Sequence, residues 1–518
     1  MMLKLKMGTV TFRNPQIFAV NTKRIALERV LTKLFMLIYS NGVDLSLKVK
    51  KEHDVKSLIE YIDILEKSGV VSGAINNQDA VEDWLRSNLL EMVFRGNVVK
   101  EKVCSLKPMH LLSFRVLNLK YCRDYNTAEQ LFLMLKSNPE VLFGLKQYLS
   151  KGWDASSNSV VRFTDLDVDT TGILYLVKEL KESKSLNTRE TPAPLLKKQS
   201  DLFNDDVRRL LVYQEKLPRS VFIEYFKILC GFHLALYTMK LVYLLPQMVD
   251  QGKIDVDDDW SMIVDATDNL NSKISKYARS DFERNENNYR RYIRATYAID
   301  VIQGMPTKDG KKASIAECLM KMKNGVNDEY FGYRLQEILN GLPDNNEKEF
   351  DKNDYQAQFR YFENSSSFDR FVYLLESSNL GQSQFRFLRE FLDAATMKNS
   401  PSKLLADGRS RKYPRRGALG SKLLETLVQI LVLEPVDGGK YQSRSLSIDE
   451  LARQIRSRYG LIINGIGDTR FINADVETCS AFKENMDAFK NKLRQIGFYT
   501  DLSDACLLQK IRPRYNFN

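Results

Sequence analysis

The feature that most constrains this chain is an apolar segment at residues 228–246, which reads ILCGFHLALYTMKLVYLLP. A helix that spans a membrane needs about 20 predominantly apolar residues. This segment approaches that length, but it carries His233 and Lys240 and ends at Pro246. Charged side chains are costly within a lipid bilayer. We therefore predict the buried central helix of a soluble protein and no membrane partner.

The length of the chain predicts several domains, because 518 residues exceed the usual ~100–200 residues per domain. We expect a mainly α, multi-domain helical body with a C-terminal winged-helix domain of α+β structure. The expected parts are an N-terminal helical domain with short strands (1–182), a polar linker (183–200), a central helical domain (201–341), a polar loop (342–356), a helical segment (357–405) and a basic winged-helix domain (406–518).

The winged helix is predicted from the order of elements near the C-terminus. These are a helix at 421–432, a β-like stretch at 441–446, a helix at 447–459, a brief strand at 461–463, a helix at 480–496 and two strands within 498–515. Ser447 and Glu450 have the spacing of a capping box, and Gly460 suits the end of that helix. Helix, strand, helix, helix and a two-stranded ribbon is the order of a winged helix.

Positive charge is concentrated in the same region. The formal net charge is +11 overall, and residues 401–518 hold 20 Lys/Arg against 13 Asp/Glu, a difference of +7. A basic terminal domain suggests a polyanionic partner, most simply double-stranded DNA. A solubilising surface is the alternative, and composition gives both interpretations similar weight.

The cations expected to contact DNA lie in three places. They are Arg409, Arg411, Lys412, Arg415 and Arg416 in a loop, Lys483, Lys490, Lys492 and Arg494 on the third helix, and Lys510, Arg512 and Arg514 in the last strand. Asn485 is expected to point outward with the helix cations. A third helix normally enters the major groove, and alternate residues of a strand share one face. Arginines in a loop are suited to contacts with the phosphate groups of DNA, which do not depend on the base sequence.

Two other functions stay open. Winged helices also serve as protein–protein modules, and Asp501 and Asp504 at the expected wing tip would repel phosphate. A divergent metal-dependent nuclease would use carboxylates such as Asp265 and Asp268. Helix-capping and turn roles are commoner for such residues.

No motif in the sequence predicts an enzyme. The chain has three histidines and no P-loop, G-x-S-x-G or H-E-x-x-H pattern, and His233 is interpreted as a core residue. The run at Asp165, Asp167 and Asp169 lacks the glycine and glutamate of a calcium loop. Six scattered cysteines form no C-x-x-C pair, which argues against zinc and favours a reducing, cytoplasmic compartment. We therefore expect no cofactor, no metal and no catalytic residues.

The amino-acid sequence near the C-terminus resembles that of known proteins. GRSRKYPRRGALGSKLLE, FKNKLRQIGFYTDLSDA and IRPRY, within about the last 120 residues, resemble accessory subunits of bacterial methylation-associated anti-phage defence systems. The resemblance implies work beside DNA methyltransferase and ATPase subunits, in discriminating or restricting invading DNA. It rests on no catalytic motif and carries over no active-site residue. The leading expectation is a non-catalytic, DNA-binding and scaffolding subunit of a defence complex.

Overall fold

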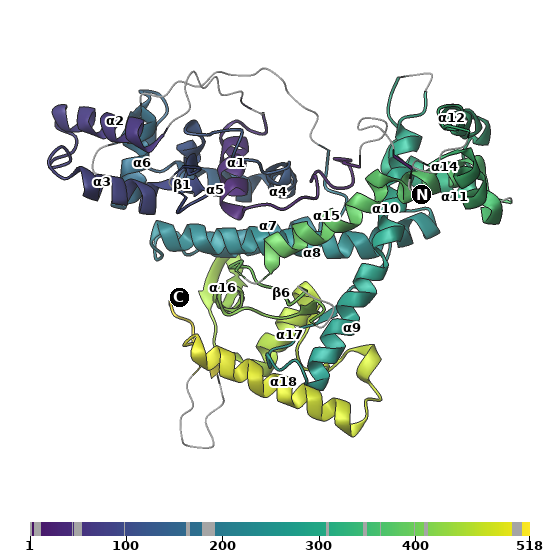
Figure 1. Ribbon diagram of the computed structural model, residues 1–518. Helices are drawn as coiled ribbons and strands as arrows, with labels where there is room; N and C mark the ends of the chain where they lie inside the picture. Colours follow the sequence, from purple (N-terminus) through teal and green to yellow (C-terminus); the bar gives the residue numbers. More distant parts are fainter. Residues whose placement is uncertain are drawn as a thin grey trace. The chain divides into compact units, whose positions relative to one another are not determined.

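A computed structural model describes residues 3–4, 12–43, 45, 54–97, 99–161, 166–178, 192–306, 310–344, 350–362, 364–397, 399–408, 413–499 and 510–517. Helix accounts for 58% and strand for 9% of the structure. This confirms the expected mainly helical class, which is also evident in Figure 1.

The chain forms two compact units, each assembled from separated segments. Unit 1 comprises Met1–Arg24, Ala235–Ser421 and Ser447–Gln509, and unit 2 comprises Ile25–Leu234, Lys422–Leu446 and Lys510–Asn518. The domain ranges expected from the sequence are contiguous and stay predictions. Both expected connecting segments are partly helical, because helices begin at Lys197 and Lys352, inside 183–200 and 342–356.

The expected winged helix is not confirmed. Its segments are divided between the two units, and much of the expected two-stranded ribbon, including Asp501 and Asp504, lies outside the described residues. The third helix begins at Val476, four residues earlier than expected. The capping box of Ser447 and Glu450 and the left-handed Gly460 at the helix end are both present.

Unit 2 is mainly helical. Its elements are α1 (Leu27–Tyr39), α2 (Val55–Lys67), α3 (Gln78–Trp84), β1 (Leu90–Val93), β2 (Lys102–Leu106), α4 (Thr127–Lys136), α5 (Pro139–Ser150), β3 (Trp153–Asp154), β4 (Ser159–Val160), α6 (Val168–Lys178), α7 (Lys197–Leu211), the first half of α8 (Arg219–Gln251), nearly all of α16 (Ser421–Leu431), β8 (Leu433–Val436), β9 (Lys440–Ser443), the start of β10 (Leu446–Ser447) and β12 (Lys510–Ile511).

A buried polar cluster joins α7 to the first half of α8 within unit 2. His233 is fully buried, with Nε2 2.9 Å from Oδ2 of Asp206 and Nδ1 2.9 Å from Nε2 of Gln199. Buried polar groups are stable only when they are hydrogen-bonded. His233 is therefore a satisfied core residue, as the sequence suggests.

Unit 1 is also mainly helical, with short strands. Its elements are the second half of α8, β5 (Met262–Ile263), α9 (Lys273–Asn287), α10 (Tyr289–Gln303), α11 (Ile315–Asn324), α12 (Asp328–Asn340), α13 (Lys352–Phe359), α14 (Ser367–Ser377), α15 (Asn379–Thr396), β6 (Leu405–Ala406), β7 (Arg416–Gly417), α17 (Ile448–Tyr459), β11 (Leu461–Ile462) and α18 (Val476–Gln495).

Short strands in unit 1 connect segments that are distant in sequence. β5 pairs in parallel with β11, β6 pairs antiparallel with β7, and the Asp265 N–H donates to the Gly417 carbonyl over 2.9 Å. A Cβ atom at Gly417 would lie only 2.4 Å from the Ile263 carbonyl oxygen. Glycine is therefore needed there for the backbones to approach.

The segment 228–246 lies within the single long helix α8. Among the described helices, α8 alone is long and apolar enough to cross a membrane, and 94% of its most apolar 18-residue window is buried. This burial is consistent with the core helix of a soluble protein.

Candidate nucleic-acid interface

The last residues of the chain form part of a small antiparallel ribbon in unit 2. β8 pairs with β9 from Leu433↔Ser443 to Val436↔Lys440, and β12 pairs with β10. The Ser443 N–H donates to the Phe517 carbonyl over 2.9 Å, and its hydroxyl donates to the Tyr515 carbonyl over 2.8 Å. The segment 510–517 therefore lies alongside the segment 440–447.

One side of this ribbon is fixed by apolar packing. Ile511 and Leu446 are buried, and the rings of Tyr515 and Phe517 lie 5.8 and 5.0 Å from the ring of Tyr213. The Tyr213 hydroxyl donates to the Gln429 carbonyl over 2.6 Å, and burial raises the pKa of this hydroxyl above its ordinary value. The terminal strand is thereby held in one register.

The ribbon also exposes cations. Lys510, Arg512 and Arg514 are exposed and alternate with buried or half-buried residues, as the sequence predicts. Lys440, at the start of β9, and Arg444, which follows the end of β9, are also exposed. We call these five residues the basic ribbon. Lys440 and Arg444 were not among the predicted contacts. Arg444 comes beside the terminal segment because its neighbour Ser443 is hydrogen-bonded to Tyr515 and Phe517.

Two carboxylates partly balance the basic ribbon. Arg514 forms an ion pair with Glu425, and Nη1 of Arg444 lies 3.4 Å from Oε1 of Glu434. The Tyr225 hydroxyl also donates to Oε1 of Glu425 over 3.0 Å. Burial and then the negative charge of Glu425 raise the pKa of Tyr225. Lys440, Lys510 and Arg512 have no carboxylate within ion-pair distance among the described residues.

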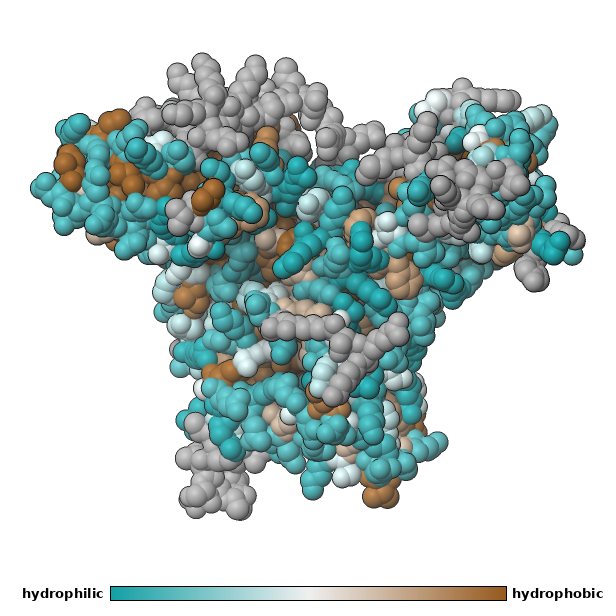
Figure 2. Space-filling model, in the orientation of Figure 1, coloured by the Kyte–Doolittle hydropathy of each residue, from teal (hydrophilic) through white to brown (hydrophobic). Residues whose placement is uncertain are grey.

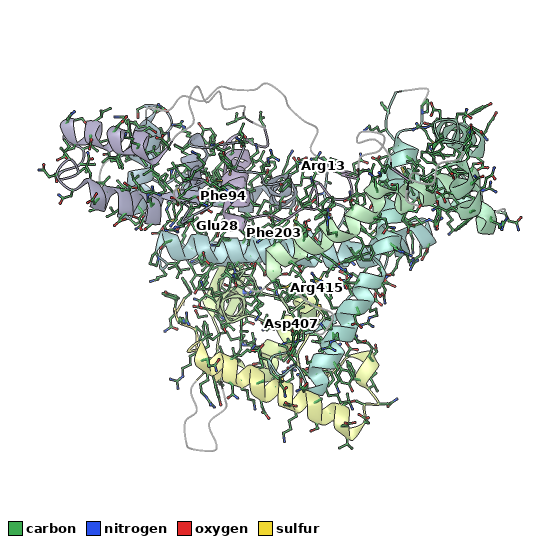
Figure 3. The ribbon with its side chains drawn as sticks, in the orientation of Figure 1. Arg13, Glu28, Phe94, Phe203, Asp407 and Arg415 are labelled. Carbon is green, nitrogen blue, oxygen red and sulfur yellow. The ribbon has the colours of Figure 1, made fainter. Side chains whose placement is uncertain are left out.

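The loop arginines have a different environment in unit 1. Arg409, Arg411 and Lys412 lie outside the described residues. Arg415 forms a bidentate pair with Asp393, at 2.8 Å from Nε to Oδ1 and 2.5 Å from Nη2 to Oδ2. Figure 3 labels Arg415 and shows it in the same part of the molecule as Asp407. Arg415 is thus engaged within the protein.

Arg416 is buried between two carboxylates. Its Nη1 lies 3.2 Å from Oδ2 of Asp265, and its Nε lies 3.1 Å from Oδ2 of Asp407. Neither contact has hydrogen-bond geometry, so the attraction is chiefly between the charges. A side chain in this position is unavailable to phosphate.

The cations of α18 lie in unit 1 and share no common environment. Lys483 and Arg494 are exposed, whereas Nζ of Lys490 is 3.9 Å from Oδ1 of Asp487. Lys492 contacts Oδ2 of Asp268 at 3.0 Å and the Leu419 carbonyl oxygen at 3.3 Å. Neither these cations nor the loop arginines belong to the unit that contains the basic ribbon.

Asn485 corrects one expectation for α18. It is fully buried, whereas the sequence suggests an outward position. Its Nδ2 donates to the carbonyl oxygens of Val264 (3.0 Å) and Ile463 (2.8 Å), and its Oδ1 accepts from the Ala266 N–H (2.7 Å). Asn485 thus joins α18 to the ends of β5 and β11.

The carboxylates of the nuclease alternative are not arranged around a metal site. Asp265 is buried against Arg416, and Asp268 contacts Lys492. Among the residues that the structure describes, no group of three or more His, Cys, Asp or Glu side chains could hold a metal ion. The geometry offers that alternative no support.

A comparison with protein families covers almost the whole chain. The model of a family described as methylation-associated defense system protein MAD7 matches residues 8–515. The chain belongs to this family. The similarity therefore extends far beyond the C-terminal segments in which the sequence resemblance was found. Membership of the MAD7 family identifies an antiviral defence protein. No curated protein matches this MAD7 family member.

Proposed function

We propose that this chain is a non-catalytic subunit of a defence complex and that it binds double-stranded DNA through the basic ribbon. The observation that carries the proposal is the exposed alternation of Lys510, Arg512 and Arg514, together with exposed Lys440 and Arg444 in the segment 440–447 that runs alongside. Membership of a methylation-associated defence family supports a role in which DNA is recognised.

The ribbon suits contact with phosphate rather than with base edges. β12 ends at Ile511, and beyond it Arg512 and Arg514 remain exposed between partly buried residues, so all three cations of the terminal segment face solvent. The partners Glu425 and Glu434 are partly exposed, and ion pairs of this kind contribute only about 0–1 kcal/mol. Phosphate groups can therefore displace them. Such contacts position a protein on DNA without specifying sequence.

A triple substitution, Lys510→Ala with Arg512→Ala and Arg514→Ala, tests the proposal in a mobility-shift assay at several salt concentrations. We expect weaker binding and a log–log salt slope that is shallower by about 2–3, since each lost phosphate contact removes about 0.9. The matched control is Lys56→Ala with Lys67→Ala and Lys178→Ala, three exposed cations on α2 and α6 of the same unit. Equal affinity and slope for the ribbon variant and the control would overturn the proposal.

A scaffolding role has separate support in unit 1. The side chains of Ile466, Ile472 and Val476 are 66%, 72% and 87% exposed. Exposed aliphatic side chains mark a protein-binding surface where they gather in one region, and these three lie within a single short segment of the chain. We propose that the segment 466–476 contacts another protein of the defence system, for which an ATPase or a DNA methyltransferase subunit is a candidate. The alternative of an interaction module without DNA contact rests on this same segment.

A further inference from the structure

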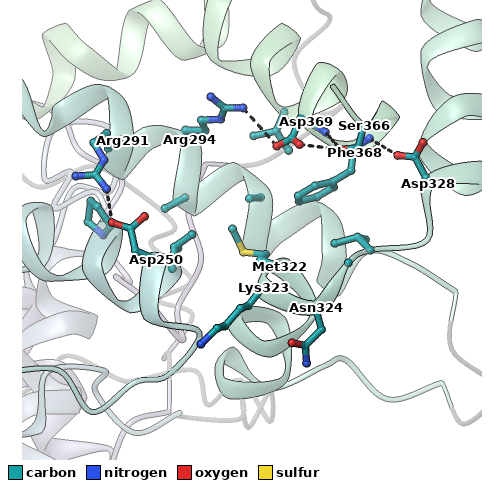
Figure 4. Close-up of a pocket in the computed structure, with 17 residues that line it drawn as sticks. Asp250, Arg291, Arg294, Met322, Lys323, Asn324, Asp328, Ser366, Phe368 and Asp369 are labelled. Carbon is teal, nitrogen blue, oxygen red and sulfur yellow. Dashed lines mark hydrogen bonds and ion pairs between the residues drawn. The ribbon is translucent and has the colours of Figure 1, made fainter. Parts of the chain in front are cut away.

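A pocket of about 690 Å³ lies within unit 1, whereas the basic ribbon belongs to unit 2. It is formed by the end of α8, one face of α10, the end of α11 and the first turns of α12 and α14. Figure 4 shows charged side chains around the opening, with Met322 and Phe368 toward the middle. The volume is in the range of pockets that bind small molecules.

About half of the pocket lining is apolar. Its lining includes Pro246 and Val249 from α8, Ala295 and Ala298 from α10, and Val372 from α14. Such a surface gains free energy when it covers the apolar or aromatic body of a ligand. The charged groups at the opening then decide which ligand is preferred.

Two arginines supply most of the unused hydrogen-bonding capacity at the opening. Arg291 and Arg294 lie one turn apart on α10, and each guanidinium carries five N–H donors. Within the described part of the chain, each donates through Nη2 alone, Arg291 to Asp250 over 2.5 Å and Arg294 to Asp369 over 3.5 Å. The second of these contacts is long for a charged hydrogen bond. Lys323 adds a third cation and contacts the Gln251 carbonyl at 3.2 Å.

The carboxylates at the opening already accept further hydrogen bonds from neighbouring groups. Oδ2 of Asp369 accepts from the Ser366 hydroxyl over 2.8 Å, and Oδ1 of Asp328 accepts from the Phe368 N–H over 3.1 Å. Both residues lie in the first turns of helices, where the helix dipole offsets negative charge. The unfilled groups of the pocket are therefore mainly donors with positive charge.

We propose that this pocket binds a small organic phosphate, with the phosphate held by Arg291 and Arg294 and the body of the molecule on the apolar lining. Asp250 and Asp369 are more than half exposed, so both can turn toward solvent when the phosphate takes their place. Arginine is suited to this role because its planar fork contacts two oxygens of one phosphate.

Isothermal titration of the full chain with adenosine 5′-monophosphate, adenosine and inorganic phosphate tests the proposal. We expect the nucleotide to bind at least tenfold more tightly than adenosine and than inorganic phosphate, because only the nucleotide uses both the arginines and the apolar lining. Binding of none of the three at millimolar concentration would overturn the proposal. Equal binding of adenosine and the nucleotide would also overturn it.

Three variants assign the binding to this pocket. Arg291→Gln with Arg294→Gln is expected to weaken nucleotide binding at least tenfold, whereas Arg290→Gln is expected to leave it unchanged. Arg290 is exposed on the same helix and does not line the pocket. Arg291→Lys with Arg294→Lys keeps the charge and is expected to bind at intermediate strength. Unchanged binding by a folded double glutamine variant would sink the proposal, and circular dichroism establishes that each variant is folded.

Discussion

Asn485 on α18 and Val264, which follows β5, are joined by a hydrogen bond of 3.0 Å from Nδ2 to the carbonyl oxygen. The same side chain is also hydrogen-bonded to the backbone of Ile463 and Ala266, so one side-chain amide satisfies three backbone groups in the interior of unit 1. A buried backbone group that loses its partner costs about 1–3 kcal/mol.

Asn485→Ala is therefore expected to lower the free energy of unfolding by about 3 kcal/mol or more, because three buried backbone groups lose their partner together. Urea unfolding followed by circular dichroism measures this change. Asn473→Ala, at an exposed position shortly before α18, is the control and is expected to change stability by less than about 0.5 kcal/mol. Similar midpoints for the two variants would contradict this role.

Arg416→Ala is expected to destabilise the protein by about 3–5 kcal/mol. Removal of Arg416 leaves Asp265 buried and Asp407 partly buried without a compensating charge, which costs more than the ion pair itself contributes. Lys483→Ala removes an exposed cation from the same unit and is expected to be nearly neutral. Thermal denaturation in parallel compares the two variants. A loss of DNA binding by Arg416→Ala at full stability would instead indicate that Arg416 contacts phosphate.

His110 predicts a dependence of stability on pH. Burial, together with the positive charge of Arg219, lowers the pKa of this imidazole from 6.5 to about 3. The folded state keeps the ring neutral between these values, whereas the unfolded chain takes up a proton below about pH 6.5. The stability is therefore fully present above pH 6.5 and falls as the pH falls, by about 2 kcal/mol between pH 7 and pH 5.

His110→Asn isolates this contribution. The asparagine can still accept the Leu112 N–H, which bonds Nδ1 of His110 over 3.1 Å, but it does not titrate. The variant is expected to be less stable at pH 7, because the ring leaves a cavity, and to lose less stability than the native chain on going to pH 5. Unfolding titrations at both pH values provide the comparison, and parallel losses would exclude His110 as the source.

Ile466→Ser with Ile472→Ser and Val476→Ser tests the scaffolding role. These side chains are mostly exposed, so the change in unfolding free energy is expected to stay below about 1 kcal/mol. The backbone of this segment is held independently, because Arg456 donates to the Ile466 carbonyl over 2.6 Å. We expect the variant to lose co-purification with other proteins of its native operon, with nuclease present to remove bridging DNA. Undiminished co-purification would exclude this segment as the contact.

Much of the local structure could be predicted from the sequence. The capping box at Ser447 and the glycine end at Gly460 follow from short-range rules and are present. The alternation of Lys510, Arg512 and Arg514 with apolar residues likewise predicted which side chains are exposed. Such patterns depend on neighbours within one turn or one strand.

The sequence by itself thus determined the helical class, the buried apolar helix α8 and the exposed face of the terminal strand, because each depends on local periodicity. Only the tertiary structure decided that Arg416 meets Asp265, that Asn485 faces inward, and that Arg444 lies beside the terminal segment. Their partners lie from 22 to more than 200 positions away. No local sequence pattern encodes which distant residue will form an ion pair or a hydrogen bond with a given side chain.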